Sequence, residues 1–176
     1  MKRIRVIGFL FAVFMLASTN AATANVWLLE AFLDGLQEVA PVATPASGFF
    51  TGTLDDVSGA FTVTTGTYQD LLAGSTAVHL HGLAPPGINA AAIITLTLDA
   101  PGTTTGTFSG AGVLTAPQIT GLLAGNTYIN IHSSAFLGGE IRGQVATIPE
   151  PGSIIMLATG AIAVIALARR RRKKAV

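Results

Sequence analysis

Short stretches of alternating apolar and polar residues fill the middle of the chain, and they restrict its fold more than any other feature. No window there keeps an apolar period of 3.6 residues for more than three turns, and Gly, Thr, Ser and Pro separate the alternating stretches. The pattern predicts eight strands, over 26–33, 48–54, 60–67, 77–81, 92–98, 105–110, 127–132 and 140–146. We therefore expect an all-β domain, either a single β-sandwich or a small barrel of about eight short antiparallel strands.

Two further features of this middle segment lead to local predictions. The stretch TAPQITGLLAG should form a helical turn, with Thr115 as its N-cap and Pro117 in its first turn. The polar tracts TGTLDD, TTGTYQD and TTTGTFSG recur near the ends of expected strands. We interpret these tracts as turns rather than as functional repeats.

The first 24 residues are typical of a secretory signal peptide. Three basic residues precede an unbroken apolar run over 6–17, and the small-residue pattern Ala22-Thr23-Ala24 precedes Asn25. The alternative is an amino-terminal membrane anchor, but such a run spans only about 18 Å as a helix, less than a hydrocarbon core of about 30 Å. We expect cleavage near Ala24, so that 1–24 is removed.

The carboxyl end, 149–176, has three parts in a fixed order. Pro149-Glu150-Pro151 precedes an apolar segment over 153–168, and six basic residues follow over 169–174. The basic cluster resists translocation, so this terminus should stay cytoplasmic, while the apolar helix holds the precursor in the membrane. The order resembles a PEP-CTERM sorting signal, which implies trimming by an exosortase-like protease. The alternative is an ordinary single-pass tail anchor.

The segment between these two ends is strongly acidic, although the whole chain has a formal charge of +1. Residues 25–150 carry nine acidic side chains against one basic side chain, Arg142, which gives a net charge of −8. Such a surface repels phosphate backbones, so we expect no nucleic-acid partner, whereas cations or cationic polymers fit it. The chain has no cysteine, so disulfides and thiolate metal sites are excluded.

Four blocks of the middle segment resemble the CHRD domain, named for the animal protein chordin and found in many secreted microbial proteins. In order they are FLDGLQEVAPVATPASG, AVHLHGLAPPG, LLAGNTYINIHS and GGEIRGQV, and the resemblance covers about 27–146. It implies a binding or structural module spanning 25–148, with no established reaction. Ala40 departs from the family's usual double proline. The motif residues Glu38, Glu140 and Arg142 match the family, and we expect Arg142 to pair with Glu140 or Glu38.

A repeated stretch contains all three histidines. LLAGSTAVHLH, 71–81, returns as LLAGNTYINIH, 122–132, with six of eleven positions identical. If Val78 and Leu80 face the core, His79 and His81 share the opposite face, and the repeat places His132 at the position equivalent to His81. Should the two strands be neighbours, the three imidazoles can bind zinc or copper, with Glu140 or water as a further ligand. Otherwise each histidine is an ordinary polar residue of an exposed strand face.

Two classes of function remain open. The first is a non-enzymatic protein of the cell surface or extracellular matrix, processed by the exosortase-like protease, that binds exopolysaccharide or surface proteins. The second is a secreted copper- or zinc-binding protein with redox activity, which uses the His-x-His strand. We assign no catalytic residues, because Ser133 and Ser134 lack a nucleophile motif. The chain also lacks the further histidines and the disulfide of copper-zinc superoxide dismutases.

Overall fold

Eight antiparallel strands close into a barrel in the computed structural model, which describes residues 25–148. The expected signal peptide, 1–24, and the expected apolar helix, 153–168, lie outside the described residues. The strands are β1 (Val26–Asp34), β2 (Ser47–Asp55), β3 (Ala60–Gln69), β4 (Ser75–Gly82), β5 (Ala92–Leu98), β6 (Gly106–Ser109), β7 (Ala111–Val113), β8 (Thr127–Ser133), β9 (Ile141–Gln144) and β10 (Ala146–Ile148).

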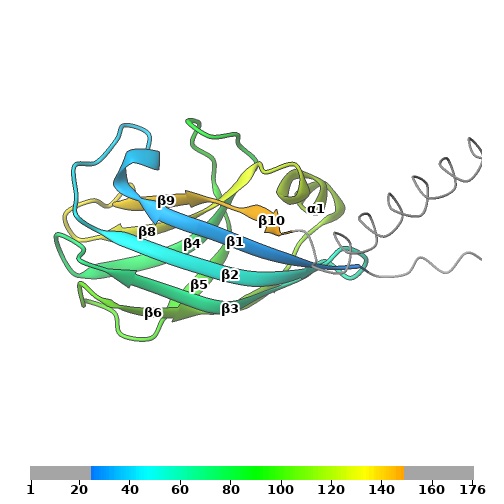
Figure 1. Ribbon diagram of the computed structural model, residues 1–176, viewed down its shortest axis with the longest axis horizontal. Helices are drawn as coiled ribbons and strands as arrows, with labels where there is room; N and C mark the ends of the chain where they lie inside the picture. The colour runs from blue at the N-terminus through cyan, green and yellow to red at the C-terminus, as the bar shows by residue number, and fades with distance from the viewer. Residues whose placement is uncertain (1–24, 149–176) are drawn as a thin grey trace, which may run out of the picture.

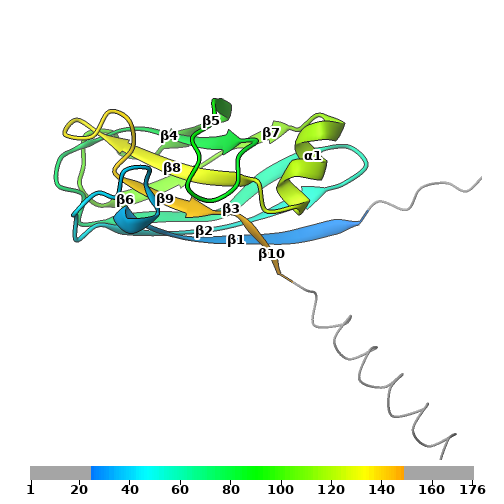
Figure 2. The same cartoon turned by 90° about the horizontal axis from the view of Figure 1, so that it is seen from above.

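The barrel runs in the order β1, β2, β3, β6, β5, β4, β8 and β9, and it closes where Asp34 of β1 pairs with Arg142 of β9. The two remaining strands, β7 and β10, pair with β3 and β1 respectively. Figures 1 and 2 show β1, β2 and β3 along one side of the barrel and β4 and β8 along the other. The all-β prediction is confirmed, and the barrel is the correct one of the two architectures expected.

Alternation along the strands decides which side chains fill the barrel. Leu29, Ala31 and Leu33 of β1 are buried while their neighbours face outward, and Phe50 and Leu54 continue the pattern on β2. On β4 and β8 the inward residues are Val78, Leu80, Ile129 and Ile131, all fully buried, as the alternation predicts for Val78 and Leu80. Because the chain has no cysteine, this apolar core is the main source of its stability.

Two short helices lie at opposite ends of the barrel (Figure 1). The helix α1 (Ala116–Leu123) begins as predicted, because the backbone N–H of Thr115 donates to the side chain of Gln118, and Pro117 lies in the first turn. The 3₁₀ turn η1 (Gly35–Gln37) follows β1, and the Asp34 carboxylate accepts the N–H of Gln37 at its start. No helix among residues 25–148 is long and apolar enough to span a membrane.

The three polar tracts lie mostly in strands, so their interpretation as turns is wrong. Each contains Thr-Gly-Thr, at 51–53, 65–67 and 105–107, in or next to β2, β3 and β6. The glycine makes room for an aromatic side chain: a Cβ at Gly52 would lie 2.7 Å from the Phe50 ring, and one at Gly66 would lie 2.6 Å from the Phe108 ring. The flanking threonines face outward and pair across the strands, as Thr51 does with Thr65. The glycines that made these tracts look like turns therefore make room for aromatic side chains of the core.

The strand expected over 140–146 is divided into β9 and β10. Between them Val145 is buried, and its N–H donates to the Thr127 carbonyl. β9 pairs with β8 and meets β1 at Arg142, whereas β10 pairs with β1 alone. The interruption at Val145 therefore lets one stretch of chain pair with two neighbouring strands, β8 and β1. Alternation alone does not predict this interruption.

Loops cover the outer face of β8, where alternation predicts exposure, and every residue of this strand is buried. The loop 83–91 brings Ala90 against the hydroxyl of Tyr128, and the loop 134–140 brings the carbonyl of Leu137 to His132. The loop 35–46 brings Glu38 beside Asn130. A polar layer therefore lies outside the barrel wall, and it contains the histidines.

Candidate metal centre

The two repeat copies form neighbouring antiparallel strands, β4 and β8. Because they run in opposite directions, equivalent positions do not face each other: His79 lies opposite Asn130, His81 opposite Tyr128, and His132 opposite Ala77. The repeat alignment of His81 with His132 is therefore not the spatial register. All three histidines nevertheless lie on the outer face of the same sheet.

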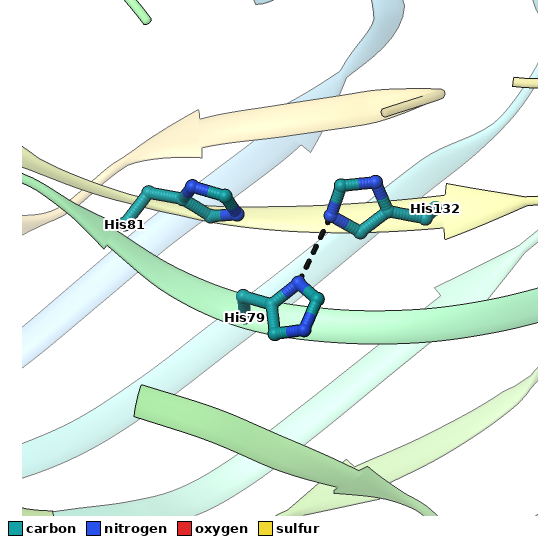
Figure 3. Close-up of side chains that lie close together, drawn as sticks. All are labelled: His79, His81 and His132. Atoms are coloured by element: carbon teal, nitrogen blue, oxygen red, sulfur yellow. Dashed lines mark hydrogen bonds between the residues drawn. The ribbon is translucent and has the colours of Figure 1, made fainter. Parts of the chain in front are cut away.

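The three imidazole rings converge on one point (Figure 3). Ring centroids lie 5.0 Å apart for His79 and His132, 5.4 Å for His79 and His81, and 5.8 Å for His81 and His132. One nitrogen from each ring can be chosen so that the three lie within 4.8 Å of one another. Imidazole nitrogens bound to one metal ion at about 2.0–2.1 Å lie about 3.3 Å apart in a tetrahedral site, so movements of the rings would have to bring these atoms closer together.

Backbone carbonyls determine which nitrogen of two rings carries the proton. Nδ1 of His81 lies 2.9 Å from the Ala90 oxygen, and Nδ1 of His132 lies 3.0 Å from the Leu137 oxygen. A carbonyl can only accept, so Nδ1 is the donor in each neutral ring and Nε2 keeps its lone pair. Hydrogen bonds of this kind orient the histidine ligands of metal sites and raise their basicity.

The Nε2 lone pairs of His81 and His132 point into the cluster, and only that of His81 is free. Nε2 of His81 is buried and has no hydrogen-bond partner. Nε2 of His132 lies 3.0 Å from Nδ1 of His79, which must therefore donate to it in the neutral state. A buried nitrogen lone pair without a donor is costly unless something binds it.

Burial keeps the cluster uncharged. Removal from water lowers the pKa of His79, His81 and His132 below the ordinary value of 6.5, and the nearness of the rings to one another acts in the same direction on His81 and His132. The rings are therefore neutral at neutral pH. Neutral imidazole is the form that binds metal ions.

An aromatic stack lies beside the cluster. The His81 ring stacks on Tyr128 with centroids 5.0 Å apart and planes at 10°, and the Arg142 guanidinium lies 3.5 Å from the centre of the Tyr128 ring. The Tyr128 hydroxyl accepts the N–H of Ala90, the residue whose carbonyl orients His81. Sequence reasoning missed Tyr128, Ala90 and Leu137 in this role, because a backbone carbonyl contributed by a loop leaves no signal in the residue pattern.

Comparison with protein-family models matches residues 29–145 to the CHRD domain. The chain belongs to the CHRD family. The following residues, 147–173, match the PEP-CTERM protein-sorting motif, so the protein is exported and sorted by an exosortase. Searches of curated proteins and of solved structures give no match. A CHRD domain and a sorting motif are both non-catalytic.

The sequence predicts that Glu140 of the CHRD domain pairs with Arg142, but in the structure it does not. Its carboxylate is fully buried and accepts hydrogen bonds from Thr44, the Leu72 N–H and Ser133. It lies outside β9, directly after Gly139, so the expected alternation with Arg142 on one strand face does not apply. Because its carboxylate oxygens accept these hydrogen bonds, Glu140 is not part of the histidine cluster.

Arg142 and Glu38 lie in the same polar layer but serve different neighbours. Arg142 is 1 % exposed, and its guanidinium donates to the carbonyls of Pro85 and Ile88 and to the side chains of Asn89 and Gln144. Burial raises the pKa of Glu38 to about 7, although the attraction of Arg142 opposes this. In the CHRD domain Arg142 therefore holds the loop 83–91 in place.

Proposed function

We propose that this exported CHRD protein is a non-enzymatic protein of the cell surface or extracellular matrix whose domain binds a transition-metal ion. One observation carries the metal site: three neutral imidazoles converge, and the Nε2 lone pair of His81 is buried without a partner. Zinc and copper are among the ions that imidazole ligands suit. The redox activity considered from the sequence is not part of this proposal.

Metal titration of the purified exported protein tests the site. We expect one equivalent of zinc or copper to bind, and the double variant His81→Ala, His132→Ala to lose it. The chain has only three histidines, all in the cluster, so histidine-dependent binding reports on this site alone. The variant Asp55→Asn, Asp56→Asn is the control for loose cation binding at the acidic turn after β2. Equal binding by the double histidine variant and the parent would contradict the proposal.

The processing steps are proposed from the sequence. The sorting motif supports a precursor that is held in the membrane with a cytoplasmic carboxyl terminus and is released to the surface when the protease acts. Changing Pro149-Glu150-Pro151 to alanines should leave an unprocessed precursor, whereas a simple tail anchor would be indifferent to the change. The exported form should begin at or near Asn25, and amino-terminal sequencing that finds Met1 would refute signal-peptide cleavage.

A second binding function, for exopolysaccharide, is favoured by a hollow on the outer face of β1, β2 and β3. The hollow is about 280 Å³ and contains a tilted aromatic pair, Phe32 and Phe49, with ring centroids 4.9 Å apart. The Phe32 side chain is 65 % exposed, and Ser47, Thr67 and Gln69 surround the pair. An exposed aromatic pair beside hydroxyl and amide groups suits the apolar face and the hydroxyls of a sugar ring.

The charge of the domain restricts which polysaccharide fits. With a net charge of −8 over residues 25–150, the domain repels acidic polymers. We therefore expect uncharged or amino-bearing chains to bind, and the variant Phe32→Ala, Phe49→Ala to bind less in a pull-down with the purified exopolysaccharide. Val113→Ala, which removes a side chain that is 75 % exposed on β7, is the control. Unchanged binding by the Phe variant would exclude this face.

A further inference from the structure

We infer that the three-histidine site is built for monovalent copper, Cu⁺, in preference to divalent ions. The inference rests on the metal binding proposed above and adds the identity of the ion. It follows from the charges around the site rather than from the ligand type, since imidazole accepts copper and zinc alike.

The ligand set brings no negative charge to the ion. Within residues 25–148 the cluster consists of three histidines and no carboxylate, and the chain has no cysteine. The nearest groups that orient the rings are neutral as well, the carbonyls of Ala90 and Leu137. An ion bound here keeps its full charge in a partly buried place, and the cost of burying charge rises steeply from a monovalent to a divalent ion.

A fixed positive charge lies behind the site. The Arg142 guanidinium is 1 % exposed and lies against Tyr128, which stacks on His81. Only the Tyr128 ring separates this guanidinium from the His81 ring, so its charge acts on a cation bound there. Glu38 offers limited compensation, because burial raises its pKa to about 7 and leaves much of it protonated near neutral pH. The repulsion of a bound ion is proportional to the charge of that ion.

The hydrogen-bond geometry also suits an ion that needs few ligands. Two rings are held by loop carbonyls with their Nε2 lone pairs directed into the cluster, while His79 bonds only to His132. Cu⁺ accepts two or three imidazoles, so it can bind the two oriented rings and recruit the third. Zn²⁺ completes a tetrahedron and needs a fourth ligand from solvent.

The decisive experiment changes the fixed charge and compares two ions. Affinities of the purified exported protein for Cu⁺, under anaerobic conditions with a competing chelator, and for Zn²⁺ are measured for the parent, Arg142→Gln and Arg142→Lys. Arg142→Gln and Arg142→Lys both lose the planar contacts to the loop 83–91 and differ in charge. Relative to Arg142→Lys, the Arg142→Gln protein should therefore bind Cu⁺ roughly tenfold more tightly and Zn²⁺ by the square of that, about a hundredfold. Equal gains for the two ions, or none in a folded Arg142→Gln protein, would overturn the inference.

A second variant tests the same electrostatics without touching Arg142. Ala77 is partly buried and lies opposite His132, so Ala77→Asp places a carboxylate beside the cluster. This carboxylate should raise Zn²⁺ affinity more than Cu⁺ affinity, and the neutral Ala77→Asn should change neither. A parent protein that binds Zn²⁺ in preference to Cu⁺ would refute the inference, and affinities that are insensitive to Ala77→Asp would refute selection by charge. Failure to bind either ion would refute the metal site itself.

Discussion

Replacing Glu38 with glutamine should make the protein more stable at alkaline pH. Glu38 is 7 % exposed, and its Oε1 atom is buried without a hydrogen-bond partner. Burial raises the pKa of this carboxyl from its ordinary 4.5 to about 7, against the attraction of Arg142. A pKa raised by this much means that ionisation in the folded protein costs about 3 kcal/mol more than in the unfolded chain.

The direction of the pH dependence follows from which state loses its proton first. Well below pH 4.5 Glu38 is protonated in both states, so ionisation of this carboxyl does not lower the free energy of unfolding. As the pH rises from 4.5 to about 7, the unfolded chain ionises first, so the free energy of unfolding falls. Glutamine cannot ionise. Between about pH 4 and pH 8 the variant should therefore gain about 3 kcal/mol relative to the parent.

Urea unfolding at a series of pH values measures this difference, with the fluorescence of Trp27, the single tryptophan, as the signal. The contributions of other titrating groups, including the histidines, to the pH dependence cancel in the difference between parent and variant, because both proteins have these groups. Glu30→Gln removes one negative charge from β1 and is the control. If the unfolding free energies of Glu38→Gln and the parent remain parallel across the pH range, the raised pKa and the reasoning from burial are refuted.

Three further predictions concern the loop that ends at β9 and the cluster beside it. Gly139→Ala should destabilise the protein by about 2 kcal/mol or more, because a Cβ at φ +129° would collide with two buried side chains, whereas Gly138→Ala meets no atom within 4 Å and should leave thermal unfolding nearly unchanged. Glu140→Gln should cost about 2 kcal/mol in urea unfolding, because its buried carboxylate accepts hydrogen bonds from three groups. Because burial lowers the pKa of all three histidines, the metal-free protein should lose stability as the pH falls below 6.5, and a variant with alanine at all three positions should lack this loss.

Sequence patterns located the strands well because alternation is a local property. The predicted strand over 77–81 lies within β4, with Val78 and Leu80 fully buried as expected. The same logic failed where a side chain's surroundings come from distant parts of the chain. The Thr-Gly-Thr tracts have the composition of turns, and only the packing of Phe50 and Phe108 against Gly52 and Gly66 shows why they are strands.

The histidine cluster depends both on local sequence patterns and on how distant parts of the chain pack together. The repeat and the alternation predicted that His79 and His81 share a face, and that the second copy carries a comparable residue at His132. Whether the copies are neighbours was undecided, because sequence similarity between two strands says nothing about how they pair. The antiparallel pairing of β4 with β8 brings the rings together, although it places Tyr128 rather than His132 opposite His81.

The sequence by itself determined the all-β class, the inward-facing residues and the sorting tail, since each depends on the order of residues over a short stretch. Only the tertiary structure decided that the strands close into a barrel at Asp34 and Arg142, and that loops cover the outer face of β8. The proton positions on His81 and His132 depend on the carbonyls of Ala90 and Leu137, which any residue type could supply. Backbone groups carry no residue identity, so only their positions in space reveal what they bind.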